Sequence, residues 1–254
     1  MIFPFLSILH SPVKTEQFSP QTYAKVMGII FLISIITGVF GEIYVPGSFI
    51  VSGDASATAF NLKSSEFLFR LGFASYLIEA LCDITLTFLL YVLLRPVNNE
   101  LALLAAFFRL VSTATFAIAE FFYFSSSAIL NNPGFLKAFS VEQQEILIQL
   151  FLNLYGAGGI IFMVFIGVAS VLFGYLMYKS RYFPRIYGAL LLLGGAGFIL
   201  KNFMYVLAPV YSSDLLMIPM ALLVFSLPPW LLSKGINMNK WEEMKLQHSQ
   251  STTL

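Results

Sequence analysis

Residues 65–94 read SEFLFRLGFASYLIEALCDITLTFLLYVLL, and this stretch decides the fold class. An α-helix rises about 1.5 Å per residue, so a helix of this length crosses a hydrocarbon core about 30 Å thick. Its apolar residues would cover all sides of a helix, whereas a barrel strand would alternate apolar and polar residues. Arg95-Pro96 follows directly, and proline stops a helix. The stretch therefore predicts a transmembrane helix.

Five further stretches have the same character: residues 24–45, 101–124, 146–178, 185–207 and 215–232. The whole chain agrees, because 58% of its 254 residues are hydrophobic and 11% are charged. A soluble domain carries about 25% charged residues, and a disordered chain has low hydrophobicity, so both classes are excluded. The sequence predicts an all-α fold, a polytopic membrane helix bundle with six transmembrane helices.

Basic residues divide unevenly between the two sides of this bundle. With the N-terminus inside, nine of them fall on the inner side: Lys14, Lys25, Arg95, Lys179, Arg181, Arg185, Lys234, Lys240 and Lys245. The outer side holds Lys63 and Lys137. Cytoplasmic segments carry the excess of Lys and Arg in membrane proteins. We therefore expect both termini to be cytoplasmic and the protein to be a multi-pass protein of the plasma membrane.

The chain divides into an interfacial N-terminal segment (residues 1–22), a six-helix transmembrane domain (23–235) and a polar cytoplasmic tail (236–254). Pro46-Gly47 is expected to end the first helix, and residues 46–64 to form an outer loop rich in Ser, Gly and Ala. Ser140-Val141-Glu142-Gln143 predicts a capping box that opens the fourth helix.

Seven ionisable residues fall within the predicted helices: Glu42, Arg70, Glu79, Asp83, Arg109, Glu120 and Lys201. Each costs about 2.5–3.5 kcal/mol at mid-span, so they are expected to face one another, the backbone or water. Counted from the inner boundary, Asp83 lies about 18 Å deep and Arg109 about 13–16 Å deep. Their helices are neighbours through a tight hairpin, which predicts a buried Asp83–Arg109 ion pair.

A second level, about 24–26 Å deep, holds Glu42, Glu79 and Lys201. Arg70 lies near the outer boundary, where it can pair with Glu66 or reach Glu120. Four acids against three cations leave one carboxyl group unmatched, Glu79 or Glu42, and an unmatched buried carboxyl group takes up a proton. The alternative is that these charges only fix the register of the helices.

Polar side chains gather in the outer half of the predicted bundle, above an inner half that is almost purely Leu, Ile, Val and Phe. This asymmetry predicts a polar pocket that opens to the outside over a dry plug. The candidate ligand-binding residues are Glu42, Glu79, Asp83, Arg109, Glu120 and Lys201. Gly194, Gly195 and Gly197 are expected to allow close helix packing, and broken helices around a substrate are the alternative.

Several chemistries lack the residues that they need. Cys82 is the single cysteine, and the two histidines, His10 and His248, lie outside the predicted helices, so intramembrane zinc and bis-histidine haem sites are not expected. The sequence has no Walker, HExxH or Gly-x-Ser-x-Gly motif and no basic tract for nucleic acid. We expect no catalytic residues, no cofactor and no metal, which favours a protein that is not an enzyme.

Between residues 23 and 233, the chain contains six motifs of one known family: Gly47–Ala55 (GSFIVSGDA), Glu66–Gly72 (EFLFRLG), Leu81–Asp83 (LCD), Leu90–Asn98 (LYVLLRPVN), Ala105–Leu110 (AAFFRL) and Phe183–Gly188 (FPRIYG). On these residues it resembles the bacterial multi-span membrane family catalogued as domain of unknown function forty-three eighty-six. The resemblance implies a six-span bundle in the bacterial inner membrane, with no established activity and no catalytic residue.

Three functions remain open at this stage. The first is an integral membrane protein that binds or transports a small solute or ion through the predicted pocket. The second is a non-catalytic scaffold or sensor subunit, acting through a partner membrane protein or as a homo-oligomer. The third is a membrane-embedded enzyme acting on a lipid or isoprenoid. A water-accessible cavity that touches Glu79 and Lys201 would favour the first function, and tight pairing with no cavity the second. A lateral opening between helices that ends at a carboxyl group would favour the third.

Overall fold

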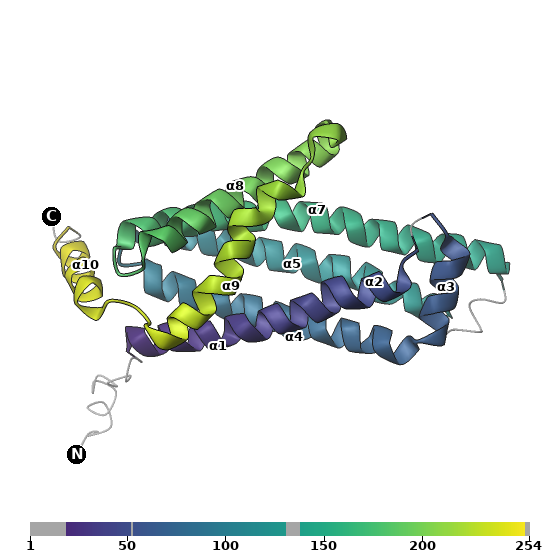
Figure 1. Cartoon of the computed structure of the whole chain (residues 1–254), viewed down its shortest axis with the longest axis horizontal. Coiled ribbons are helices and arrows are strands. Elements are labelled where there is room, and N and C mark those ends of the chain that lie inside the picture. Colours follow the sequence, from purple (N-terminus) through teal and green to yellow (C-terminus); the bar gives the residue numbers. More distant parts are fainter. Residues whose placement is uncertain (1–18, 52, 131–137, 252–254) are drawn as a thin grey trace, which may run out of the picture.

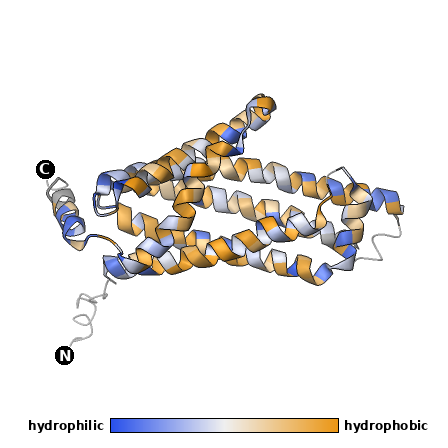
Figure 2. Cartoon of the chain, in the orientation of Figure 1, coloured by the Kyte–Doolittle hydropathy of each residue, from blue (hydrophilic) through white to orange (hydrophobic). Residues whose placement is uncertain are grey.

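The computed structural model describes residues 19–51, 53–130 and 138–251, and every regular element in these residues is helical. Six helices are long and apolar enough to cross a membrane: Pro20–Phe49, Glu66–Leu94, Asn99–Ser126, Val141–Ser180, Arg185–Leu207 and Asp214–Ser233. The prediction of an all-α bundle with six transmembrane helices is confirmed. Figure 2 shows apolar residues along the length of these helices, with hydrophilic residues gathered towards the ends of the bundle.

The first span contains three consecutive elements, α1 (Pro20–Gly38), the π-helix η2 (Val39–Tyr44) and α2 (Val45–Phe49). The other long helices are α4 (Glu66–Leu94), α5 (Asn99–Leu130), α7 (Val141–Ser180), α8 (Arg185–Leu207) and α9 (Ile218–Ser233). Shorter helices are α3 (Ala55–Ser64), η3 (Pro209–Tyr211), η4 (Asp214–Met217) and α10 (Met238–Ser251).

The six spans form a closed ring in chain order. Each of α1, α4, α5, α7 and α8 packs against the next, and α9 returns to α1. Both described ends of the chain lie at one end of the bundle, here named the terminal end, while α2 and α3 lie at the opposite loop end (Figure 1). The hairpin of α8 and α9 tilts away from the rest of the ring, so that its tip stands apart from α7 and α2 (Figure 1).

Glycines allow α7 and α8 to meet at backbone distance. A β carbon added at Gly174 would lie 2.4 Å from the backbone nitrogen of Leu192, and one at Gly188 would lie 2.4 Å from that of Tyr178. A β carbon at Gly195 would lie 2.6 Å from the carbonyl oxygen of Gly167. Small residues at such contacts let helices pack closely in a membrane, as the sequence predicted for the glycines of α8.

The prediction of an outer loop is wrong for most of residues 46–64, because these residues are helical. The first span continues through Pro46 to Phe49, because α2 follows η2 without a break and Pro46 is the second residue of α2. Residues Ala55–Ser64 then form α3, whose N-cap is Asp54: its carboxylate accepts a hydrogen bond from the backbone N–H of Ala57 at 2.8 Å.

The structure confirms one predicted helix start and describes parts of the predicted N-terminal segment and tail. Ser140 caps α7 in the predicted capping box, with Ser140 Oγ accepting from the backbone N–H of Gln143 and the Gln143 side chain accepting from that of Ser140. Most of the predicted interfacial segment, residues 1–18, lies outside the described residues, and α1 already begins at Pro20. Within the predicted tail, Met238–Ser251 forms the helix α10.

Candidate functional site

Asp83 on α4 and Arg109 on α5 form the ion pair that the sequence predicts. Arg109 Nη2 donates to Asp83 Oδ1 at 2.6 Å, and the two side chains are 14% and 12% exposed. The short connection between Leu94 and Asn99 brings the two helices together, so residues at similar depth meet. The guanidinium Nε of Arg109 is buried with no hydrogen-bond partner among the described residues, which leaves part of this cation unsatisfied.

Glu79 lies one turn before Asp83 on α4, and its neighbour is a second acid. Its carboxyl group lies against that of Glu42, which comes from η2. Gly38 leaves room for the Glu79 carboxyl group because it has no side chain. A β carbon at Gly38 would lie 2.9 Å from Glu79 Oε1 and 3.1 Å from Oε2. Within the described part of the chain neither acid has an ion-pair partner, and Glu79 Oε2 is buried without a hydrogen bond.

The π-helix around Glu42 is a feature that the sequence did not predict. The backbone N–H of Val45 bonds to the carbonyl oxygen of Phe40, five residues back, so η2 is wider than the α-helices on either side. A π-helix is rare and occurs often at functional sites, because it changes the direction in which a side chain leaves the helix. The run Val39–Tyr44 carries no composition that distinguishes it from an α-helix in an apolar span.

A cavity of about 310 Å³ lies inside the ring of spans and reaches this group of charges. Its polar lining comes from six side chains, Ser34, Glu42, Glu79, Asp83, Arg109 and Ser170. The remaining lining is almost entirely apolar and includes Leu90, Met177 and Leu227, which belong to the half that was expected to be a dry plug. The cavity is therefore amphipathic, and its charged residues come from η2, α4 and α5.

The mouth of the cavity is lateral. Three residues that line it remain widely exposed: Val39 at 46%, Ile43 at 67% and Phe225 at 68%. Val39 and Ile43 belong to η2 and Phe225 to α9, and all three stand well inside their membrane-spanning segments. The opening between η2 and α9 therefore lies on the side of the bundle, whereas the sequence led us to expect a pocket open to the outside.

Glu120 is buried near the site without lining the cavity. It lies on α5 and is 4% exposed, and neither of its carboxyl oxygens has a hydrogen-bond partner among the described residues. Its charge is within electrostatic reach of Glu42 and of Tyr155 on α7, whose hydroxyl group lies 3.2 Å from that of Tyr76. Glu120 thus extends the group of acids from the cavity towards the loop end.

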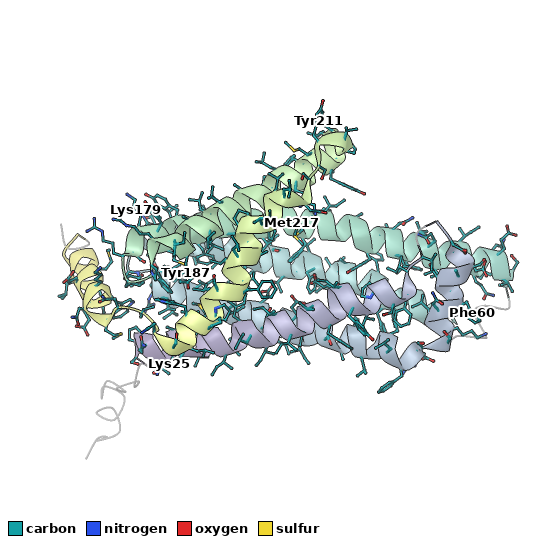
Figure 3. The ribbon with its side chains drawn as sticks, viewed as in Figure 1. Lys25, Phe60, Lys179, Tyr187, Tyr211 and Met217 are labelled. Carbon is teal, nitrogen blue, oxygen red and sulfur yellow. The ribbon has the colours of Figure 1, made fainter. Side chains whose placement is uncertain are left out.

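Lys201 is the candidate residue that the structure separates from the others. Its Nζ lies 2.6 Å from Asp214 Oδ1, and it does not line the cavity. Equal depth does not bring Lys201 to Glu42, because α8 tilts away from the ring towards the hairpin tip, where Tyr211 points outward (Figure 3). Arg70 pairs with Glu66, with Nε donating to Oε1 at 2.8 Å, which is one of its two predicted partners.

Comparison with known proteins identifies a family but no activity. The family model described as "Domain of unknown function (DUF4386)" matches residues 26–235. A protein of Archaeoglobus fulgidus, described as "Uncharacterized protein", is 29% identical over 118 residues, which cover 46% of this chain and 57% of that protein. The chain thus spans little more than half of that relative. No solved structure matches the chain.

Proposed function

Because the chain belongs to the DUF4386 family, whose description assigns no activity, we propose from the geometry that this integral membrane protein binds a small amphipathic molecule dissolved in the bilayer. The observation that carries the proposal is the amphipathic cavity with its lateral mouth between η2 and α9. A ligand dissolved in lipid reaches such a mouth without crossing water, and its polar group then meets Glu42 and Glu79.

The lining fits a ligand that is mostly apolar. Ligand sites are usually apolar cavities in which a few placed polar groups fix the orientation of the bound molecule. Here four methionines, Met27, Met163, Met177 and Met220, line the wall. Methionine side chains are flexible and polarisable, so they adapt to ligands of different shape. This property supports a site for a class of molecules.

Orientation and location are part of the same proposal. Lys25 on α1 and Lys179 on α7 both lie at the terminal end of the bundle (Figure 3). The connections Arg95–Asn98 and Arg181–Pro184 lie there as well, and both contain arginine. This distribution supports a terminal end that faces the cytoplasm. We place the protein in the plasma membrane, which for a bacterial chain is the inner membrane.

The lateral mouth also supports the third function named from the sequence, an enzyme that acts on a lipid. Binding of an amphiphile is the first step of both functions, so the two share one binding test. Incubation of the protein with each bound probe, followed by mass spectrometry of the extracted probe, separates them. An unchanged probe indicates a binding protein, and a chemically altered probe indicates an enzyme.

Cavity-filling substitutions test the proposal. Leu223 on α9 lines the cavity and is 2% exposed, while its neighbour Leu222 is 56% exposed and points away. Purified protein in phosphatidylcholine nanodiscs is titrated calorimetrically with three decyl probes at submicellar concentration: decyltrimethylammonium, decanol and decyl sulfate. At least one probe should bind saturably, Leu223→Trp should weaken it by about tenfold or more, and Leu222→Trp should not. Failure of all three probes to bind above empty nanodiscs rejects the proposal, as does unchanged binding to Leu223→Trp.

A further inference from the structure

The charge of the ligand can be inferred from the charges around the cavity. We propose that the site selects cationic amphiphiles, and that the cationic group is bound between Glu42 and Glu79 in exchange for a proton that these two carboxyl groups share. This inference rests on the proposed function and adds to it a substrate class and a coupling to protons.

The first step is the imbalance of charge in the lining. Three acids, Glu42, Glu79 and Asp83, face the cavity together with one cation, Arg109. Arg109 and Asp83 compensate each other at 2.6 Å, so two carboxyl groups remain without a cation. The other two intramembrane cations do not serve them, because Lys201 is bound to Asp214 on the tilted hairpin and Arg70 is paired with Glu66. An anionic ligand group would meet two acids here, and a cationic group would supply the missing charge.

The second step concerns the groups that face Glu42 and Glu79 from each packed element. On α4 these are Asp83 and Cys82, on α5 Arg109 and Glu120, and on α7 Tyr155. The lining residues of α8 and α9 are all apolar, for example Leu191 and Met220. Arg109 is the only cation in this set, so every other ionisable neighbour either adds negative charge or stays neutral. The surroundings therefore favour a positive group at Glu42 and Glu79.

The third step is the behaviour of two adjacent carboxyl groups without a cation. Two carboxylates that share a site repel each other, and the pair holds a proton more tightly than one carboxylate alone. A bound cation can take the place of that proton, because each supplies one positive charge beside the Glu42 and Glu79 carboxyl groups. The proton leaves to solvent as the ligand enters. Affinity for a cation therefore rises as the pH rises.

The fourth step is the apolar remainder of the cavity, which a metal ion or a free proton would not need. Phe31, Phe162, Phe198 and Phe225 line it with the methionines described above. Aromatic rings attract cations through their faces, and their area buries an alkyl tail. Among the described residues, no group of three or more His, Cys, Asp and Glu is arranged to hold a metal ion. An organic cation with an apolar tail uses both parts of the site.

Two probes with opposite permanent charges and equal tails test the inference. Wild-type protein in phosphatidylcholine nanodiscs is titrated with decyltrimethylammonium and with decyl sulfate at about pH 6 and about pH 8. Neither probe titrates in this range, so any dependence on pH belongs to the protein. We expect the cation to bind at least about tenfold more tightly than the anion, and more tightly at the higher pH. Calorimetry in buffers of different ionisation enthalpy should show proton release on binding of the cation.

The variants are Glu79→Gln, the double variant Glu42→Gln/Glu79→Gln, and Glu100→Gln as a matched control. Glu100 is an exposed acid in the first turn of α5, outside the cavity. The double variant should lose both the preference for the cation and the proton release, and Glu79→Gln should lose the proton release even if the double variant fails to fold. Glu100→Gln should keep both.

The outcomes separate this inference from the proposed function. Equal binding of cation and anion, both weakened by Leu223→Trp, overturns the charge selection and leaves the amphiphile site standing. Preference for the cation without proton release overturns the exchange. Absence of binding by every probe rejects the proposed function itself.

Discussion

Asp83 and Glu79 stand one turn apart on the same helix and face the same cavity, yet their surroundings differ. Asp83 is paired with Arg109 at 2.6 Å, which joins α4 to α5. Glu79 lies against Glu42 and the backbone of Gly38, with no cation among the described residues. The first acid is compensated within the protein, and the second is not.

This difference separates a structural charge from a candidate functional one. A buried charge with a good partner stabilises a particular packing of two helices. Its removal destabilises the protein, because the partner is then a buried charge without compensation. A buried acid without a partner contributes nothing comparable to folding, and intramembrane acids of this kind mark ligand or proton sites. The comparison predicts that the same change, carboxylate to amide, strongly destabilises the protein at Asp83 and has little effect on its stability at Glu79.

The largest effect is expected at Asp83. Asp83→Asn leaves the Arg109 guanidinium buried without its counter-ion and should lower the free energy of unfolding by about 3–5 kcal/mol. The measurement is a denaturant or thermal unfolding curve of the purified protein in detergent. The double variant Asp83→Met/Arg109→Met should recover most of the loss, since neither charge then remains. A melting temperature of Asp83→Asn equal to that of wild type would refute the structural role of the pair.

A smaller effect is expected where the backbone makes room for Glu79. In Gly38→Leu the new side chain must displace the Glu79 carboxyl group, whose Oε1 would lie 2.9 Å from the added β carbon. Overpacking of this kind costs about 1–3 kcal/mol, and the displaced acid should also lose its contact with Glu42. Gly47→Leu is the matched control, because a β carbon at Gly47, in the same span, has no neighbour within 4 Å. Equal melting temperatures for the two variants would show that Glu79 can move freely.

Glu79→Gln sharpens the comparison most directly. The amide has the same shape and carries no charge, so the free energy of unfolding should change by less than about 1 kcal/mol or increase slightly. The unfolding curve is recorded beside that of Asp83→Asn under the same conditions. A loss as large as that of Asp83→Asn would mean that Glu79 has an essential partner in the folded protein, and the distinction drawn above would fail.

The sequence was sufficient to predict the six spans and the Asp83–Arg109 ion pair. Six apolar runs predicted six spans, and Ser140 with Gln143 predicted the start of α7. Asp83 and Arg109 could be paired because a short hairpin fixes the relative depth of two adjacent helices. Asp54 also carried a usable signal, since Asp is a preferred N-cap residue, yet the Ser, Gly and Ala around it suggested a loop.

The sequence did not predict the tilt of α8 or the π-helix at Glu42. Depth along a helix says nothing about the direction in which the helix leans, so Lys201 was grouped with Glu42 although α8 carries it away from the ring. The π-helix at Glu42 depends on one additional residue in a turn, which composition does not record. The lateral mouth lies between η2 and α9, whereas the sequence suggested an outward-facing pocket because polar side chains gather in the outer half of the spans.

The smallest effect is expected at a different ion pair, Lys201 and Asp214, which can be compared with Asp83 and Arg109. Its distance, 2.6 Å, equals that of Asp83 and Arg109, but the side chain of Asp214 is 88% exposed. An exposed carboxylate stays hydrated when its partner is lost, and exposed pairs contribute little to folding. Asp214→Asn should therefore leave the melting temperature unchanged, measured beside Asp83→Asn. A loss comparable to that of Asp83→Asn would mean that distance, and not burial, decides what an ion pair contributes in this protein.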